Sequence, residues 1–252
     1  MILRHIATNE WRTLRAERAF LPVVLLLAVL AAYGIFNGMA WVRFQRASID
    51  AVRHDHSQRL SKLKRQLVAI EEGRQEARGF QDPRSGGSIG GAAAVPWVVK
   101  EPGPLAALAI GQSDLYPYYF KAGLRSKQTV MVNDELENPV NLLAGRFDFA
   151  FVLVYLYPLL ILALSYDILS REKEQGTLAI ALANPVPLST VILGKLLTRA
   201  AIVIGTAMVL CLAAALGAGV PLGGEGVALK LALWLAVVVT YGAFWFLLAV
   251  AV

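Results

Sequence analysis

The sequence predicts an all-α polytopic membrane protein with four transmembrane helices and an α-rich extracytoplasmic insertion. Hydrophobic residues make up 57% of the 252 residues, and the mean hydropathy is +0.56, which is high for a soluble domain. These residues gather in runs of about 20, the length that crosses about 30 Å of hydrocarbon as a helix. The runs have no Lys or Arg at their centres, and they give the predicted spans 19–43, 147–169, 200–220 and 229–252.

Residues 1–18 precede the first span and are predicted to form an amphipathic helix. Apolar residues recur there at helical spacing, and arginines occupy much of the remainder. Basic residues around an apolar stripe that contains Trp are typical of a helix lying in the headgroup layer. A solvated basic N-terminus is the alternative. The apolar positions are Leu3, Ile6, Ala7, Trp11 and Leu14, and the arginines are Arg4, Arg12, Arg15 and Arg18.

The insertion between the first two spans, residues 44–146, has two different halves. The stretch 44–78 has no Pro, and its apolar residues follow alternating three- and four-residue steps, which predicts a long helix. A tract rich in Gly and Ser follows at 82–88. The remainder is rich in Pro and aromatic residues, which predicts a small irregular lobe with a strand near Gln128–Val132. The apolar seam of the helix consists of Ile49, Val52, His56, Leu60, Leu63, Leu67 and Ile70.

Basic residues in the short flanking segments predict the orientation of the chain. The N-terminal segment carries four arginines, and the connection 170–199 carries two lysines and two arginines. Positive charge in short loops favours the cytoplasm, whereas long loops are translocated largely regardless of charge. We therefore expect the N-terminus and the connection 170–199 to be cytoplasmic. The loop Pro221–Ala228 has no basic residue and is expected outside.

The connection 170–199 is predicted to contain a short helix that lies at the membrane surface and acts as a lever between the second and third spans. A charged turn is followed by a short helix from about Gly176, and Pro185 and Pro187 end that helix because proline cannot continue it. Ser189 is expected to cap the next helix. A partner that grips the short helix would move both spans together. A simple interfacial connector is the alternative.

The string EKEQGTL at 172–178, followed by a Pro-bounded break and LGK at 193–195, resembles the pattern of type-2 ABC transporter permeases. In that family this connection forms the coupling helix that contacts the ATPase subunit, and residues 1–18 resemble the elbow helix. The external insertion resembles that of a bacterial subgroup. The resemblance assigns the ATPase contact to Arg171, Glu172, Glu174, Gly176, Thr177 and Leu178.

The resemblance implies a permease of the bacterial inner membrane that exports a substrate. The implied partners are the lipid bilayer, a cytoplasmic ABC ATPase and a second copy or a sister permease, with room for a periplasmic partner. The chain has no phosphate-binding loop, so ATP hydrolysis is expected in the partner subunit. The family plan has six spans and four are predicted here, so we expect this sequence to be part of a longer polypeptide.

Two other functions fit parts of the sequence. The external lobe could transmit force to an envelope partner, or the chain could be a membrane-bound sensor with an external ligand-binding domain. The net charge of +6 is not arranged for nucleic acid, and no catalytic residue, cofactor or metal site is expected. Asp148 and Asp167 are interpreted as solvated residues at the ends of the second span. Tyr155, Tyr157 and Pro158 are interpreted as packing residues, with the lining of a cavity as the alternative.

Overall fold

The computed structural model divides the chain into two compact units. The first comprises Met1–Met39, Pro104–Gly111 and Arg146–Val252, and the second comprises Ala40–Gly103 and Gln112–Gly145. The structure describes the following residues: 2–18, 20–76, 79, 82–89, 94–111, 113, 115–123, 143, 145–165 and 187–251.

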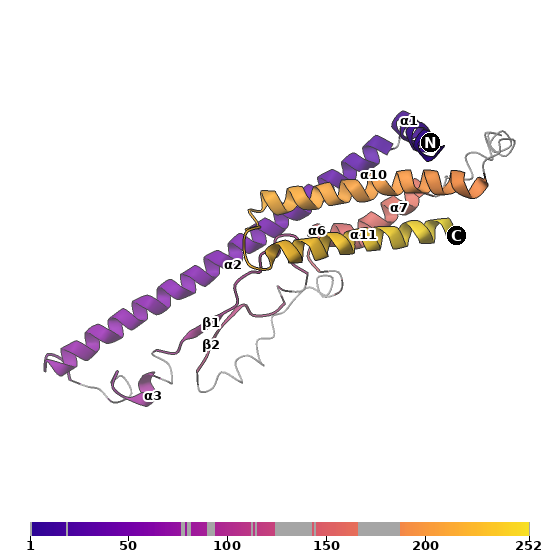
Figure 1. The fold of residues 1–252 in the computed structure, drawn as a ribbon. Helices are drawn as coiled ribbons and strands as arrows, with labels where there is room; N and C mark the ends of the chain where they lie inside the picture. Colours follow the sequence, from indigo (N-terminus) through magenta and orange to yellow (C-terminus); the bar gives the residue numbers. More distant parts are fainter. Residues whose placement is uncertain are drawn as a thin grey trace. The chain divides into compact units, whose positions relative to one another are not determined.

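Two helices form the N-terminal part of the chain (Figure 1). Helix α1 spans Ile2–Ala16, and helix α2 spans Phe20–Glu71, so the predicted first span and the predicted external helix form one unbroken helix of 52 residues. Gly73 ends α2 because its φ of 72° lets the chain leave the helix. The Arg74 amide then donates to the Ala69 carbonyl and the Gly73 amide to the Ile70 carbonyl, as in a Schellman cap.

The remaining helices of the first unit correspond to the other predicted spans. Helix α6 (Phe149–Phe151), the π-helical turn η3 (Val152–Leu156) and helix α7 (Tyr157–Ser165) follow one another without a break. Helix α10 spans Leu188–Gly217, and helix α11 spans Val227–Ala251. Within the described residues, α2, α10 and α11 are long and apolar enough to cross a membrane, and Phe149–Ser165 is a shorter apolar helix. The count of four spans therefore stays a prediction.

The expectation that Ser189 caps the third long helix was wrong. Helix α10 begins one residue earlier, at Leu188, and its N-cap is Pro187 in an extended conformation without a side-chain cap. At the other end, Gly219 has a φ of 66° and begins the turn toward α11. The Val220 amide donates to the Ala215 carbonyl, which closes α10 in the same way as α2 is closed.

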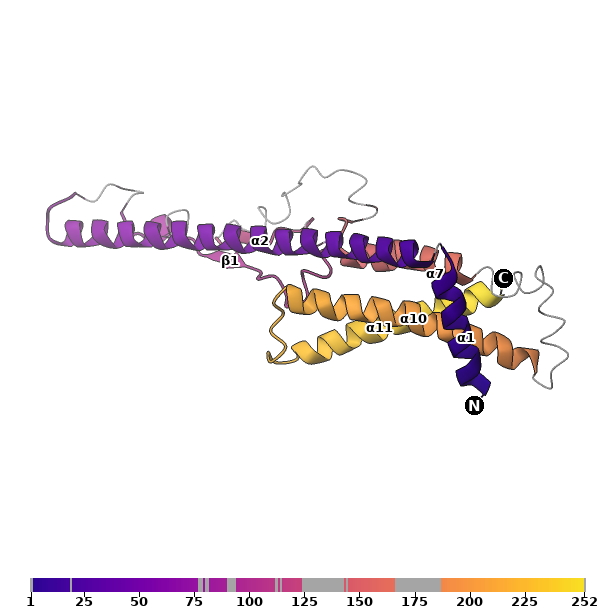
Figure 2. The ribbon, with the colours of Figure 1, turned by 90° about the horizontal axis from the view of Figure 1, so that it is seen from above.

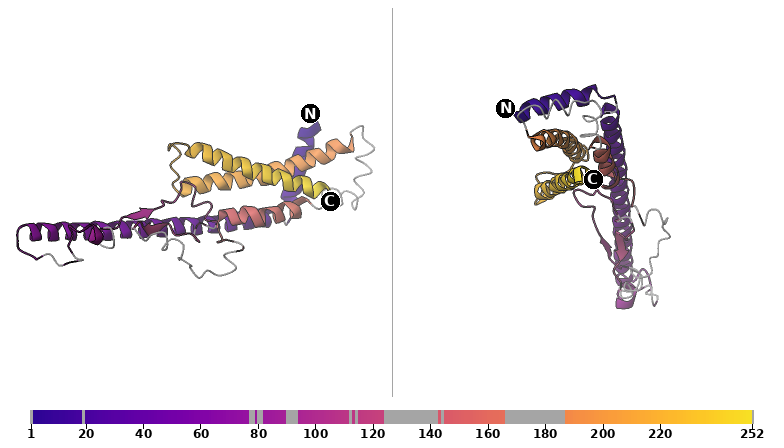
Figure 3. Two further views of the ribbon diagram at one scale, coloured as in Figure 1. Left: turned by 90° about the horizontal axis from the view of Figure 1, so that it is seen from below. Right: turned by 90° about the vertical axis from the view of Figure 1, so that its right-hand side faces the viewer.

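The core of the first unit lies where α7, α10 and α11 pack together, and Figure 3 shows α10 and α11 side by side. Helix α1 lies across α10 at a steep angle (Figure 2). The largest fully buried side chains include Tyr157 of α7, Phe246 of α11 and Leu14 of α1. Because these helices are apolar on most of their faces, burial of a few large side chains fixes which faces meet.

Asp148 is a buried structural residue, so its interpretation as a solvated residue was wrong. Its side chain is 1% exposed. One carboxylate oxygen accepts from the amides of Ile110 (2.7 Å) and Gly111 (3.1 Å), and the other accepts from the Phe151 amide (2.7 Å) as the N-cap of α6. Three amide donors replace the lost water, so the carboxylate joins the turn 104–111 to the start of the second predicted span.

The second unit contains a two-stranded antiparallel sheet and the distal part of α2. Strand β1 (Trp97–Val99) pairs with β2 (Tyr119–Lys121), with Val98 opposite Phe120. Arg53 of α2 donates to Glu101 at 2.7 Å. Of the predicted seam, Ile49 is buried and the other members are half-buried. A three-residue helix, α3, spans Gly86–Ser88. The predicted strand at Gln128–Val132 lies outside the described residues.

Candidate functional site

The residues predicted to contact an ATPase all lie between α7 and α10. Arg171, Glu172, Glu174, Gly176, Thr177 and Leu178 fall in 166–186, outside the described residues. The structure does describe both ends of that connection, where α7 ends at Ser165 and α10 begins at Leu188. The candidate site is therefore built from the residues that surround these two ends.

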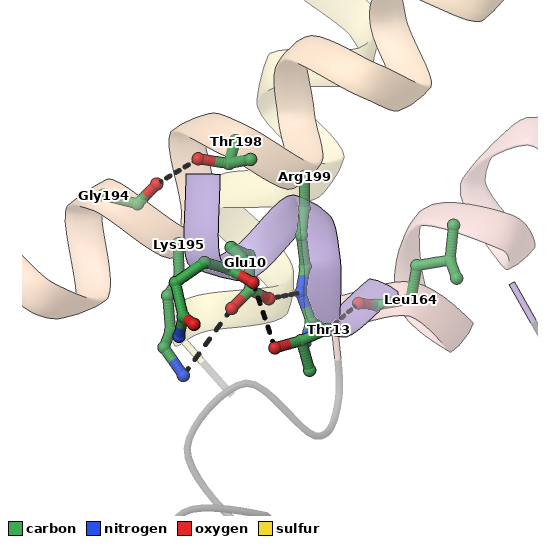
Figure 4. A network of polar contacts seen from close by, with 8 residues as sticks. Glu10, Thr13, Leu164, Gly194, Lys195, Thr198 and Arg199 are labelled. Carbon is green, nitrogen blue, oxygen red and sulfur yellow. Dashed lines mark hydrogen bonds and ion pairs between the residues drawn. The ribbon is translucent and has the colours of Figure 1, made fainter. Parts of the chain in front are cut away.

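Glu10 of α1 forms a buried ion pair with Arg199 of α10 close to these ends (Figure 4). The Arg199 Nε donates to Glu10 Oε1 at 2.7 Å, and the side chains are 4% and 2% exposed. Lys195 Nζ lies 3.7 Å from the other carboxylate oxygen of Glu10, and its side chain is 15% exposed. Lys195 and Arg199 are four residues apart, so one face of α10 presents both cations to α1.

Arg199 also reaches the end of α7. Its Nη1 donates to the carbonyl oxygen of Leu164, the residue before the last residue of α7. We call Glu10, Lys195, Arg199 and the Leu164 carbonyl the Glu10 clamp. The clamp joins α1, α7 and α10 through one guanidinium group.

The polar clamp is enclosed by close apolar packing. Leu14 of α1 is 1% exposed, and Leu196 of α10 is 6% exposed. A Cβ atom added to Gly194 would lie 2.8 Å from Cγ2 of Ile6, so α1 approaches α10 where α10 has no side chain. Burial of this kind lowers the local dielectric and strengthens the ion pair.

The sequence contained a signal for this pair that pattern reasoning did not use. Glu10 lies four residues from both Ile6 and Leu14, so it interrupts the apolar stripe of the amphipathic helix. An acid on the buried face of a helix requires a cation or several donors nearby. Lys195 and Arg199 were assigned only to the basic flank of a span. The sequence signal therefore predicts a buried partner for Glu10, and the packing of α1 on α10 decides which cations fill that role.

The clamp joins three elements through charged and hydrogen-bonding groups. No group of three or more His, Cys, Asp or Glu in the described ranges is arranged to hold a metal ion. The carboxylate has two cationic partners, so it is held in place and is not presented to a substrate. A displacement of either end of the connection between α7 and α10 would therefore act on α1 as well.

Comparison with known proteins gave one family match. The family model described as ABC-2 family transporter protein matches residues 4–252, which include most of α1 and all the later helices that the structure describes. No curated protein and no solved structure matches the chain. This match covers nearly the whole chain. The long apolar helices among the described residues agree with it. The chain therefore belongs to the ABC-2 family of transporter proteins, as a multi-pass membrane permease component of an ABC transporter.

Proposed function

We propose that this permease couples ATP hydrolysis by a separate cytoplasmic ATPase subunit to substrate export across the bacterial inner membrane. Members of the family are membrane components and not ATPases themselves. The observation that carries the proposal is the Glu10 clamp, because it links α1 to both helices that flank the connection 166–186. A force applied to that connection would therefore act on α1, α7 and α10 together.

In this proposal the connection 170–199 is the coupling element and the ATPase holds its acidic string. Glu172 and Glu174 are the polar contacts, and Thr177 and Leu178 lie at the start of a short docking helix. Charged contacts of this kind favour encounter and register between partners. The N-terminus and the connection lie in the cytoplasm, and residues 44–146 form the external insertion. The pathway forms between two copies of the permease or between this chain and a sister subunit.

The test is co-purification of the permease with the ATPase of the same transporter. Replacing Glu172→Lys and Glu174→Lys should reduce the yield of bound ATPase, since like charges facing each other at an interface cost several kcal/mol. Gly176→Pro should reduce transport-linked ATP turnover by disturbing the backbone. The matched control is Glu225→Lys, in the loop between α10 and α11. Wild-type ATPase yield and turnover in the Glu172 and Glu174 variants would contradict the proposal.

The unbroken α2 favours a second candidate function, in which the chain transmits force to an envelope partner. A helix of 52 residues is about 78 Å long, and it continues from the predicted first span into the second unit. Ala47→Pro would interrupt it because proline removes a hydrogen bond and clashes with the preceding turn. Force transmission predicts loss of the envelope function at normal ATP turnover. An unchanged function in that variant would exclude this role.

A further inference from the structure

An apolar groove lies between α1 and α10, on the part of α1 that precedes the first span. Its volume is about 500 Å³. The residues that line it are Ala7 and Trp11 from α1 and Gly194, Leu197, Thr198, Ala201 and Ile202 from α10, and the Thr198 hydroxyl donates to the Gly194 carbonyl. Trp11 is 42% exposed and Leu197 is 59% exposed, so the groove is open on one side.

The exposed charges along the groove are positive. Arg4 and Arg15 lie about 20° and 40° around α1 from Trp11, at 100° per residue, so all three share one face. The Arg15 guanidinium carbon lies 5.8 Å from the centre of the Trp11 ring. Arg4 and Arg15 are exposed, whereas Glu10, the one acidic residue within Ile2–Ala16, is buried in the clamp. An apolar floor with a cationic rim matches an anionic amphiphile.

We propose that this groove binds an anionic phospholipid of the bilayer, with an acyl chain between α1 and α10 and the phosphate at Arg15, whose guanidinium lies beside Trp11. Helix α10 is long and apolar enough to extend into the hydrocarbon layer, and an acyl chain can then enter the groove from that side. The positive charge of the exposed arginines favours an anionic lipid as the occupant of the groove. A second copy of α1 would bring the same exposed arginines and be repelled, while an anionic headgroup is attracted to each arginine near the surface.

The experiment uses the full chain in nanodiscs that contain phosphatidylglycerol as the minor lipid and phosphatidylcholine as the major lipid. Bromine atoms, which quench tryptophan fluorescence at short range, are placed on the acyl chains of one lipid at a time. The difference between the unaltered chain and its Trp11→Phe variant isolates the emission of Trp11. We expect brominated phosphatidylglycerol to quench Trp11 several-fold more, per molecule present, than brominated phosphatidylcholine.

Two sets of variants separate a site from general surface attraction. Arg15→Gln should lower the preference for phosphatidylglycerol about five-fold, as expected for one basic residue at the membrane surface. Arg12→Gln is the matched control, because Arg12 lies about 100° around the helix from Trp11. Ala201→Phe should fill the groove and reduce the quenching of Trp11 while it leaves the arginines in place.

Three outcomes would overturn the proposal. Equal quenching by the two lipids would mean that Trp11 only contacts bulk bilayer. An equal loss in Arg12→Gln and Arg15→Gln would show diffuse attraction to the whole helix instead of a site. Absence of quenching at Trp11 by either lipid would mean that no acyl chain enters the groove. None of these outcomes depends on the ATPase, so the result is independent of the proposed export function.

Discussion

The carboxylate of Glu10 is removed from water and depends on two cations and the surrounding packing for its stability. Burying an isolated charge is costly, and the pair repays that cost only when its geometry is good and its hydrogen bonds are made. Arg199 meets this condition because its Nε donates to Glu10 and its Nη1 donates to the Leu164 carbonyl. One guanidinium thereby donates to a carboxylate and to a backbone carbonyl through two nitrogens of its planar fork.

Removing single members of the clamp should therefore cost more than removing the whole pair. Glu10→Leu leaves Lys195 and Arg199 close together without the carboxylate, and we expect a loss of about 3–5 kcal/mol in unfolding free energy. Arg199→Met should cost less, because Lys195 remains within 3.7 Å of Glu10. The double variant should recover part of the loss through apolar packing. Unfolding of the purified chain in mixed micelles measures all three.

The control for this prediction is an exposed pair of the same chemistry. Arg59 and Asp55 lie 2.9 Å apart on α2 with both side chains 50% exposed. Exposed pairs contribute about 0.2–1 kcal/mol, so Arg59→Met should have little effect. If Glu10→Leu were as mild as Arg59→Met, the clamp would not hold α1 in place.

At the scale of elements, Pro158 explains the irregular start of the second predicted span. Proline has no amide hydrogen, so it cannot donate to the carbonyl of Val154 four residues earlier. The helix forms a π-helical turn at Val152–Leu156 just before it. The Tyr241 hydroxyl of α11 donates to the Val154 carbonyl at 2.9 Å. Interpretation of Pro158 and Tyr157 as packing residues is confirmed by their burial, whereas Tyr155 is 46% exposed.

Tyr241→Phe should destabilise the contact between α11 and the irregular turn. The variant removes the donor to Val154, and side-chain hydrogen bonds within membranes contribute about 0.6 kcal/mol on average and up to about 1.7 kcal/mol. Tyr157→Phe is the matched control. The Tyr157 hydroxyl is buried and has no hydrogen-bond partner among the described residues, so its loss should be neutral or slightly stabilising. The free energy of unfolding in mixed micelles is measured for both variants. Equal changes in Tyr241→Phe and Tyr157→Phe would contradict the assigned role of Tyr241.

The helices could be predicted from the sequence because hydropathy and length act locally. The N-terminal helix, the long helix after the first span and the apolar segments are all present near their predicted positions. Polar partners could not be predicted in the same way. Asp148 binds amides 37 and 38 residues away. Glu10 binds an arginine 189 residues away. Such pairs depend on how helices pack, which periodicity along one helix does not encode.

At the scale of the whole molecule, the orientation depends on basic residues in short segments. Lys195 and Arg199 supply half of the positive charge of the connection 170–199, and both face the carboxylate of Glu10. Acidic residues contribute little to orientation, so this pairing leaves their effect in place. Arg171, Lys173 and the exposed arginines of α1 act in the same direction, and together these charges favour the cytoplasm.

Thiol labelling in intact cells tests this orientation directly. The native Cys211 is buried and is replaced by alanine, and single cysteines are introduced by Ser61→Cys, Ser113→Cys and Ser170→Cys. An impermeant thiol reagent should label the first two positions from outside, because both lie in the predicted external insertion. It should label Ser170→Cys only after the cells are opened, since that position begins the predicted cytoplasmic connection. The denatured proteins serve as controls for equal thiol reactivity. Labelling of Ser170→Cys in intact cells would reverse the orientation, and the connection 170–199 could then not meet a cytoplasmic ATPase.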